Sequence, residues 1–265
     1  MARHRRAWRA LCEALEGIEL DHEKQRVVIS VAARAASMID PEVRVSKRSW
    51  WERSANGDHE PRHELATELR AHGCHWTTDS LTNLVQDPHL RNLEVLRLED
   101  AALSDRAIDI LLNAPWLENL RELYLGRNLI GDIGLERLAK SHALPRLEVL
   151  SLAGNQLNDA GILTMLEGHT LRSLRALYLD DNALGDASVE ALAISPMGRR
   201  LEQLGLSGNE HITSKSIEVL RQRLEVGFPA LEQVHLLSCG DGASDASALC
   251  LMRDVRRLAK ERAIS

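Results

Sequence analysis

Leucines alternate with other residues in a short phrase that occurs four times in the middle of the chain. Leu-Arg-Glu-Leu-Tyr-Leu-Gly-Arg-Asn begins at Leu120, and its near-copies begin at Leu147, Leu174 and Leu201, each 27 residues after the one before. The alternation over Leu-x-Leu predicts a short strand with its leucines on one side. One such strand cannot bury its own apolar face, so the copies are expected to stack against one another.

A second pattern, typical of a helix, follows each strand. An aspartate returns at the same interval, and we expect each one to be the N-cap of a helix, because its carboxylate can accept from the first-turn amides. Apolar residues three and six positions later would form one stripe that packs on the strand layer. The aspartates are Asp105, Asp132, Asp159 and Asp186, and the stripe is Ile108, Leu111, Leu135, Leu138, Ile162, Met165, Val189 and Leu192.

The phrase Leu-x-x-Leu-x-Leu-x-x-Asn-x-Leu resembles the leucine-rich repeat, and a full helix within each unit of this length resembles the ribonuclease-inhibitor-like subclass of that family. This resemblance implies an α/β fold, a right-handed solenoid or horseshoe with a concave parallel sheet and convex helices. The asparagine that ends each strand can satisfy backbone groups left unpaired by the turn. Stacked copies would therefore form a ladder of Asn128, Asn155, Asn182 and Asn209.

Weaker copies extend the pattern in both directions. We expect about seven repeats, starting at residues 66, 93, 120, 147, 174, 201 and 231. Ala101, Cys74 and Cys239 take the asparagine position in the weaker copies. His72, His75 and His89 lie near Cys74 in the sequence, but the repeat already explains this cysteine and no four-ligand zinc pattern is present. We therefore expect neither a metal nor a cofactor.

The chain divides into two parts. Residues 1–62 are expected to form a helical N-terminal cap or a small module of their own. Trp50 and Trp51 would cover the open end of the first repeat, although a binding site or a dimer contact is an alternative. Residues 63–265 are expected to form the leucine-rich repeat domain. Ser244 or Asp245 would cap its C-terminal helix, which would run to about Arg262 and cover the last layer with Leu249, Met252, Val255 and Leu258.

Composition narrows the classes of function. The net charge is −6, and the acidic excess lies downstream of residue 60, which argues against a nucleic-acid partner. No apolar run approaches the roughly 20 residues of a membrane span, so no membrane association is expected. The four cysteines are far apart, which favours a reduced, cytoplasmic protein. The common nucleotide-binding, hydrolase and metalloprotease motifs are absent, so a stand-alone enzyme is disfavoured.

The outward positions of the strands form the candidate binding face. The chain has only two tyrosines, and Tyr124 and Tyr178 occupy the same outward column two repeats apart, with Ser151 between them. Strands lie about 4.8 Å apart, so the two rings should stand roughly 10 Å from each other. Tyrosine and arginine are favoured residues at protein interfaces. The predicted partner-binding residues are Arg97, Tyr124, Arg127, Ser151, Tyr178, Asp180 and Asp181.

These features favour a non-enzymatic protein–protein interaction module or scaffold whose concave face binds a protein partner. Two alternatives remain open. The resemblance to ribonuclease inhibitors and to the Ran GTPase-activating protein implies a regulator, an inhibitor or activator of an enzyme such as a nuclease or GTPase. In that case Arg97 or Arg127 would act on phosphates held by the partner. The third possibility is a substrate-recruiting adaptor that docks through residues 1–62.

Overall fold

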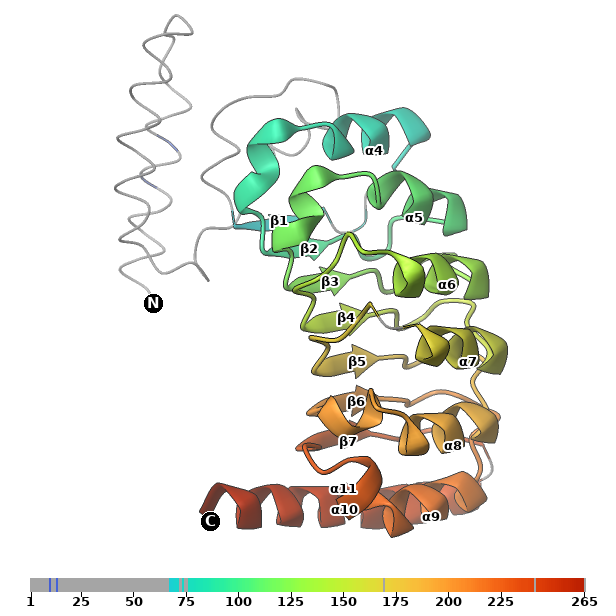
Figure 1. The fold of residues 1–265 in the computed structure, drawn as a ribbon. Coiled ribbons are helices and arrows are strands. Elements are labelled where there is room, and N and C mark those ends of the chain that lie inside the picture. Colours follow the sequence, from blue (N-terminus) through green and yellow to red (C-terminus); the bar gives the residue numbers. More distant parts are fainter. Residues whose placement is uncertain are drawn as a thin grey trace, which may run out of the picture.

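The computed structural model describes residues 67–71, 73, 76–168, 170–240 and 242–264, together with the single positions 10 and 13. Within this part the chain is an α/β solenoid, in which seven parallel strands form one sheet in the order of the sequence (Figure 1). The strands are β1 (Glu68–Arg70), β2 (Val95–Arg97), β3 (Glu122–Tyr124), β4 (Val149–Ser151), β5 (Ala176–Tyr178), β6 (Gln203–Gly205) and β7 (Gln233–His235). The predictions for residues 1–62, and those for His72, Cys74 and His75, lie outside the described residues.

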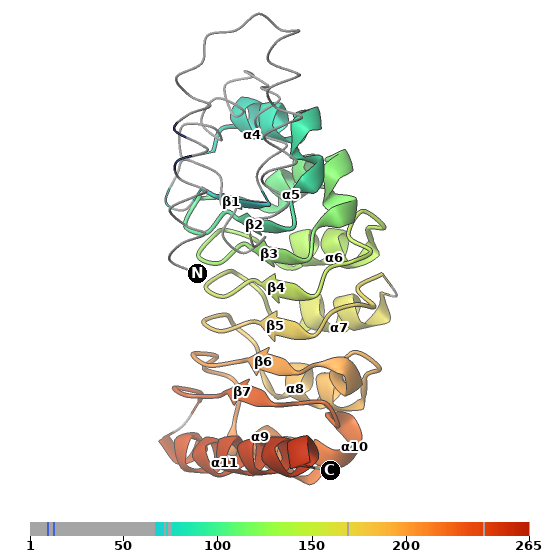
Figure 2. The same ribbon diagram turned by 90° about the vertical axis from the view of Figure 1, so that its left-hand side faces the viewer.

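Helices alternate with the strands and lie on one side of the sheet (Figures 1 and 2). We call the opposite sheet face the concave face. The α-helices are α4 (Thr78–Val85), α5 (Asp105–Leu111), α6 (Asp132–Lys140), α7 (Asp159–Glu167), α8 (Asp186–Ile194), α9 (Ser214–Gln222), α10 (Leu224–Gly227) and α11 (Gly242–Ile264). Short 3-10 helices precede three strands, namely η3 (Pro88–Asn92), η4 (Pro115–Asn119) and η5 (Gly198–Arg200).

The strand register places equivalent residues side by side. Leu96 pairs with Leu123, Leu123 with Leu150, and the same offset holds from β1 to β6. The last step is longer, because Leu204 pairs with Val234. The inward leucines are buried, and Leu123, Leu150 and Leu177 have no exposed surface. The predicted helix stripe is confirmed, since each of its eight members is at most 1% exposed. Stacking thus buries one continuous core between the strand layer and the helices.

The asparagine ladder is confirmed, and it connects neighbouring repeats. Asn155 donates to the carbonyl of Leu152 in its own repeat, at 2.9 Å, and to that of Leu125 in the preceding repeat, at 3.0 Å. Its side-chain oxygen accepts from Ile130 N, also in the preceding repeat. Asn128, Asn182 and Asn209 bond in the same way. In the last repeat the thiol of Cys239 donates to the carbonyl of Leu206 at 3.3 Å, so Cys239 replaces asparagine as predicted.

The prediction that the periodic aspartates are N-caps was wrong. The cap positions belong to Ser104, Gly131, Asn158 and Gly185, and each aspartate is the first residue of its helix. The carboxylate accepts instead from the cap amide of the next repeat. For example, Asp105 accepts from Gly131 N at 2.7 Å, and Asp132 accepts from Asn158 N at 3.0 Å. Because this partner belongs to another repeat, a rule based on local sequence could not distinguish the two roles.

Asp186 accepts three hydrogen bonds from the next repeat and gives a pH-dependent prediction. Its carboxylate accepts from Thr213 N at 2.8 Å and from Ser216 Oγ at 2.5 Å. Burial alone would raise the pKa of Asp186, but the hydrogen bonds from Ser216 and Thr213 outweigh it and hold the pKa below its ordinary value. The folded state therefore binds fewer protons here than the unfolded state. This contribution to stability is complete well above the unfolded pKa of about 3.9 and is lost as the pH falls through the lower, folded pKa.

We expect Asp186→Asn to lower the free energy of unfolding at pH 7, and the difference from wild type to shrink as the pH falls from about 5 to 3. Urea unfolding of both proteins at several pH values measures this. A difference that stays constant over the whole range would show that the charge of Asp186 contributes nothing.

Helix α11 closes the described solenoid beside β7, and its start and one residue of its predicted buried face differ from the prediction. It begins at Gly242, not at Ser244 or Asp245. Ala248, Leu251 and Val255 are buried, whereas Leu249 is 58% exposed. Of the four residues predicted to be buried, Val255 is buried and Met252 and Leu258 are partly buried against the core, so only Leu249 was predicted wrongly. None of the helices in the described part of the chain is both long and apolar enough to cross a membrane.

Candidate binding face

The predicted central column is confirmed by the register of the strands. It runs across the concave face, one residue per strand, and neighbouring members are paired partners. Ser151 therefore stands between Tyr124 and Tyr178, as expected. The members are Arg70, Arg97, Tyr124, Ser151, Tyr178, Gly205 and His235.

Arg97 and Tyr124 form one cluster at the β2–β3 side of the face. The guanidinium carbon of Arg97 lies 3.6 Å from the centroid of the Tyr124 ring, a cation–π contact. Arg97 Nε also donates to Glu68 Oε1 at 2.9 Å, and the Tyr124 hydroxyl donates to Glu122 Oε2 at 2.8 Å. Burial, followed by the hydrogen bond to Glu122, raises the pKa of Tyr124 to about 12. The phenol is thus neutral at physiological pH and is held in one orientation.

Tyr178 belongs to a second cluster. Its hydroxyl donates to the side-chain oxygen of Gln203, and its ring centroid lies 6.3 Å from that of His235. Burial, together with the negative charges of Asp180 and Glu122, raises the pKa of Tyr178. Asp180 accepts from Ser207 N at 2.9 Å, and burial raises the pKa of its carboxyl group despite this hydrogen bond.

Arg127 and Asp181 are exposed and lie in the turns after the strands, not in the column itself. Their φ angles are +54° and +53°, the left-handed region. Gly154 and Gly208 occupy the same position in the neighbouring repeats, with φ of +68° and +71°. Each of these residues directly precedes a ladder asparagine. The glycines at this position were a signal in the sequence for the left-handed turn, and the prediction did not use it.

Sequence reasoning also missed a second outward column, which supplies the acceptors that orient the tyrosines. Glu122 precedes the inward leucine of β3, and Gln203 has the same place on β6. Glu68, which is only 7% exposed, holds Arg97 from β1 in the same way. These positions could have been identified from the repeat spacing. The sequence does not show, however, which neighbouring side chain each of them contacts.

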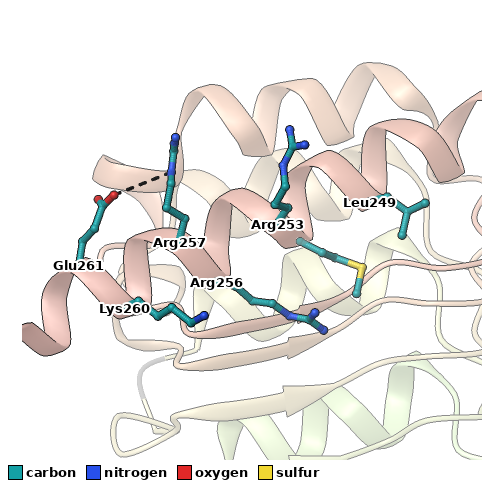
Figure 3. Close-up of a pocket in the computed structure, with 7 residues that line it drawn as sticks. Leu249, Arg253, Arg256, Arg257, Lys260 and Glu261 are labelled. Atoms are coloured by element: carbon teal, nitrogen blue, oxygen red, sulfur yellow. Dashed lines mark ion pairs between the residues drawn. The ribbon is translucent and has the colours of Figure 1, made fainter.

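A separate hollow of about 580 Å³ lies against α11 (Figure 3). None of the residues predicted to bind a partner lines this hollow. One of its cations, Arg257, forms an ion pair in which its Nε lies 4.0 Å from Glu261 Oε1. Within the described residues, no group of three or more His, Cys, Asp and Glu side chains could hold a metal ion. The hollow is lined by Leu249, Met252, Arg253, Arg256, Arg257, Lys260 and Glu261.

Comparisons with known proteins agree with the repeat pattern. A family model described as "Leucine Rich repeats (2 copies)" matches residues 118–165, and one described as "Leucine Rich repeat" matches residues 170–193. Among solved structures, the chain is similar to a tropomodulin C-terminal domain from Caenorhabditis elegans, with 15% identity and a TM-score of 0.39 over 68% of this chain and 91% of that one. A search of curated proteins gave no match. The chain therefore contains leucine-rich repeats, which form part of an α/β solenoid.

Proposed function

We propose that this chain is a non-enzymatic interaction module that binds a protein partner on its concave face. Leucine-rich repeat domains generally mediate protein–protein interaction. The observation that supports this face is the orientation of its two tyrosines before any partner is bound. Both hydroxyls are fixed by acceptors on the sheet, Glu122 and Gln203. An anchor that is already ordered loses less conformational entropy on binding.

The proposal includes the ribonuclease-inhibitor-like subclass, which is supported by the constant strand offset and by a helix in each of these repeats. For the alternative role as a regulator of a partner enzyme, the two candidate arginines differ. Arg97 is engaged by Glu68 and Tyr124. The guanidinium of Arg127 is exposed and has no partner among the described residues. Arg127 is therefore the better candidate to reach a partner's phosphate groups.

Tyr124→Ala/Tyr178→Ala tests the proposal by affinity capture from native lysate, read by mass spectrometry. Interface tyrosines contribute about 2 kcal/mol each when they are hot spots, so recovery of the partner should fall at least about ten-fold. Both rings lie on the surface of the sheet, so the thermal midpoint should stay within about 3 °C of wild type.

The matched control is Ile133→Ala/Leu163→Ala. These residues are 56% and 43% exposed on α6 and α7, on the helix side of the sheet. The control should recover the partner as well as wild type does. Equal recovery by all three baits would exclude the tyrosine pair as the binding site. In the regulator alternative, Arg127→Ala would abolish the effect on the partner enzyme while binding is retained.

A further inference from the structure

Arg97 and Tyr124 show within this chain how the concave face holds a guanidinium. Arg97 stands one strand before a column tyrosine, stacks on its ring, and is bonded to a carboxylate of the neighbouring column. The other tyrosine of the column lacks this arrangement. Ser151 stands one strand before Tyr178, in the place equivalent to Arg97, and its side chain is too short to cover the ring.

The place beside Tyr178 lies between the strand of Tyr178 and the strand of Tyr124. Tyr124 and Tyr178 lie on the strands flanking Ser151, so their backbones are separated by two strand spacings, roughly 10 Å. Arg97, on β2, covers one face of the Tyr124 ring. Tyr178 leans toward β6, where its hydroxyl bonds Gln203 and its ring packs on Gly205. We call the space above Ser151, between the two rings, the Tyr slot.

The bottom of the Tyr slot carries a polar group without a partner. Ser151 is only 8% exposed, and its hydroxyl has no hydrogen bond to any described residue. A hydroxyl oxygen can accept from an N–H group of a bound ligand.

The charges around the Tyr slot favour a cation. The negative charges of Asp180 and Glu122 both act on the Tyr178 hydroxyl, and Glu122 also lies 3.9 Å from the Arg97 guanidinium. No outward residue of the strands from β4 to β7 is lysine or arginine, and the positive charge that acts on Asp180 is that of His235 on β7. Aromatic ring faces also attract cations, and arginine in particular stacks on them through its planar guanidinium.

We propose that the Tyr slot receives an arginine side chain of the protein partner, stacked on Tyr178 from the side of Ser151 as Arg97 is stacked on Tyr124. The guanidinium would donate to the Ser151 hydroxyl and pair with Glu122 or Asp180. This inference rests on the proposed function, because it names the group that the concave face recognises.

Nuclear magnetic resonance of the full chain with ¹³C-labelled tyrosine tests the slot, because two tyrosines give only two sets of ring signals. Tyr124→Phe and Tyr178→Phe assign them. The probe is N-acetyl-arginine amide, used at about 10–50 mM because one stacked guanidinium binds weakly. N-acetyl-citrulline amide, which has nearly the same shape but no charge, is the control ligand at matched ionic strength. The Tyr178 signals should move with the arginine probe and at least five-fold less with citrulline.

Ser151→Arg places a guanidinium in the slot from within the chain. It should shift the Tyr178 signals of the free protein in the direction that the probe does, and abolish the response to the probe. Gln233→Arg adds the same charge at an exposed position on β7 and should leave the response intact. The proposal is overturned if the arginine probe moves no tyrosine signal, if citrulline acts equally, or if Ser151→Arg responds like wild type.

The capture experiment distinguishes failure of the slot from failure of the proposed function. A partner whose recovery depends on the tyrosine pair, together with no arginine response, overturns the Tyr slot and leaves the concave face as the binding site. A partner that binds equally well to the double alanine variant overturns the proposed function, and the slot with it.

Discussion

Replacing Asn128 with alanine is expected to lower the free energy of unfolding by about 3–5 kcal/mol, one of the largest effects of any single change in the ladder. Its side-chain oxygen accepts from Ala101 N and Leu103 N, both at 3.0 Å, and its amide nitrogen donates to Leu98 O and Leu125 O, both at 2.9 Å. Asn128 is only 5% exposed, so water cannot replace these bonds without opening the turn. Each buried polar group left unpaired costs about 1–3 kcal/mol.

Urea unfolding followed by circular dichroism measures the loss. Asn113→Ala is the matched control, because Asn113 is exposed at the end of α5 and its amide bonds only Asp109 O; a change below about 0.5 kcal/mol is expected. Asn128→Cys should fall between the two, since a thiol still donates, as Cys239 does, but cannot accept from two amides. Equal stability of Asn128→Ala and wild type would show that the ladder does not stabilise the stack.

The second large effect is expected at Gly227, where α10 meets the end of α8. A Cβ atom added to Gly227 would stand 2.3 Å from the carbonyl oxygen of Ala193, a backbone atom that cannot turn away. Alanine in place of glycine favours a helix by about 1 kcal/mol. Displacing packed backbone costs about 1–3 kcal/mol or more. Because the overlap here is severe, Gly227→Ala is expected to destabilise the fold by about 2–3 kcal/mol.

Gly131→Ala provides the comparison in the same unfolding experiment. Its added Cβ would meet Asp105 Oδ2 at 3.5 Å, which is ordinary van der Waals contact, so the loss should stay below about 1 kcal/mol. Both variants add one Cβ atom, but only at Gly227 does that atom overlap backbone. If both variants lost the same free energy of unfolding, the close approach of α10 to α8 would not explain the effect of Gly227→Ala.

The strand and helix positions could be predicted because each repeat carries its own local signal. The inward leucines and the helix stripe follow from period 2 and period 3.6, and stacking makes them all buried. Asn128 and Cys239 were also placed correctly, since both fall at the same position of the repeat. On α11 the prediction was wrong for Leu249, because this helix lies outside the repeat and has no second copy in the sequence to compare with.

For the candidate face, the sequence predicted which residues share a column, but not which contacts their side chains make. The sequence predicted that Tyr124, Ser151 and Tyr178 share an outward column, and the register agrees. It did not predict that Arg97 stacks on Tyr124, because that depends on side-chain rotamers and on the carboxylate of Glu68 one strand earlier. The exposed guanidinium that the sequence suggested is therefore already engaged within the chain.

The repeating pattern of amino acids is enough to specify which residues point inward, where the strands lie, and which residues of neighbouring repeats are equivalent. These properties repeat with a fixed period, so a single copy of the pattern defines them. The partners across repeats are known only from the folded chain: Asp105 bonds the next cap amide, Tyr178 bonds Gln203, and Ser151 has no partner among the described residues. Such contacts join residues of different repeats, and their geometry depends on how each side chain leans once the repeats are stacked.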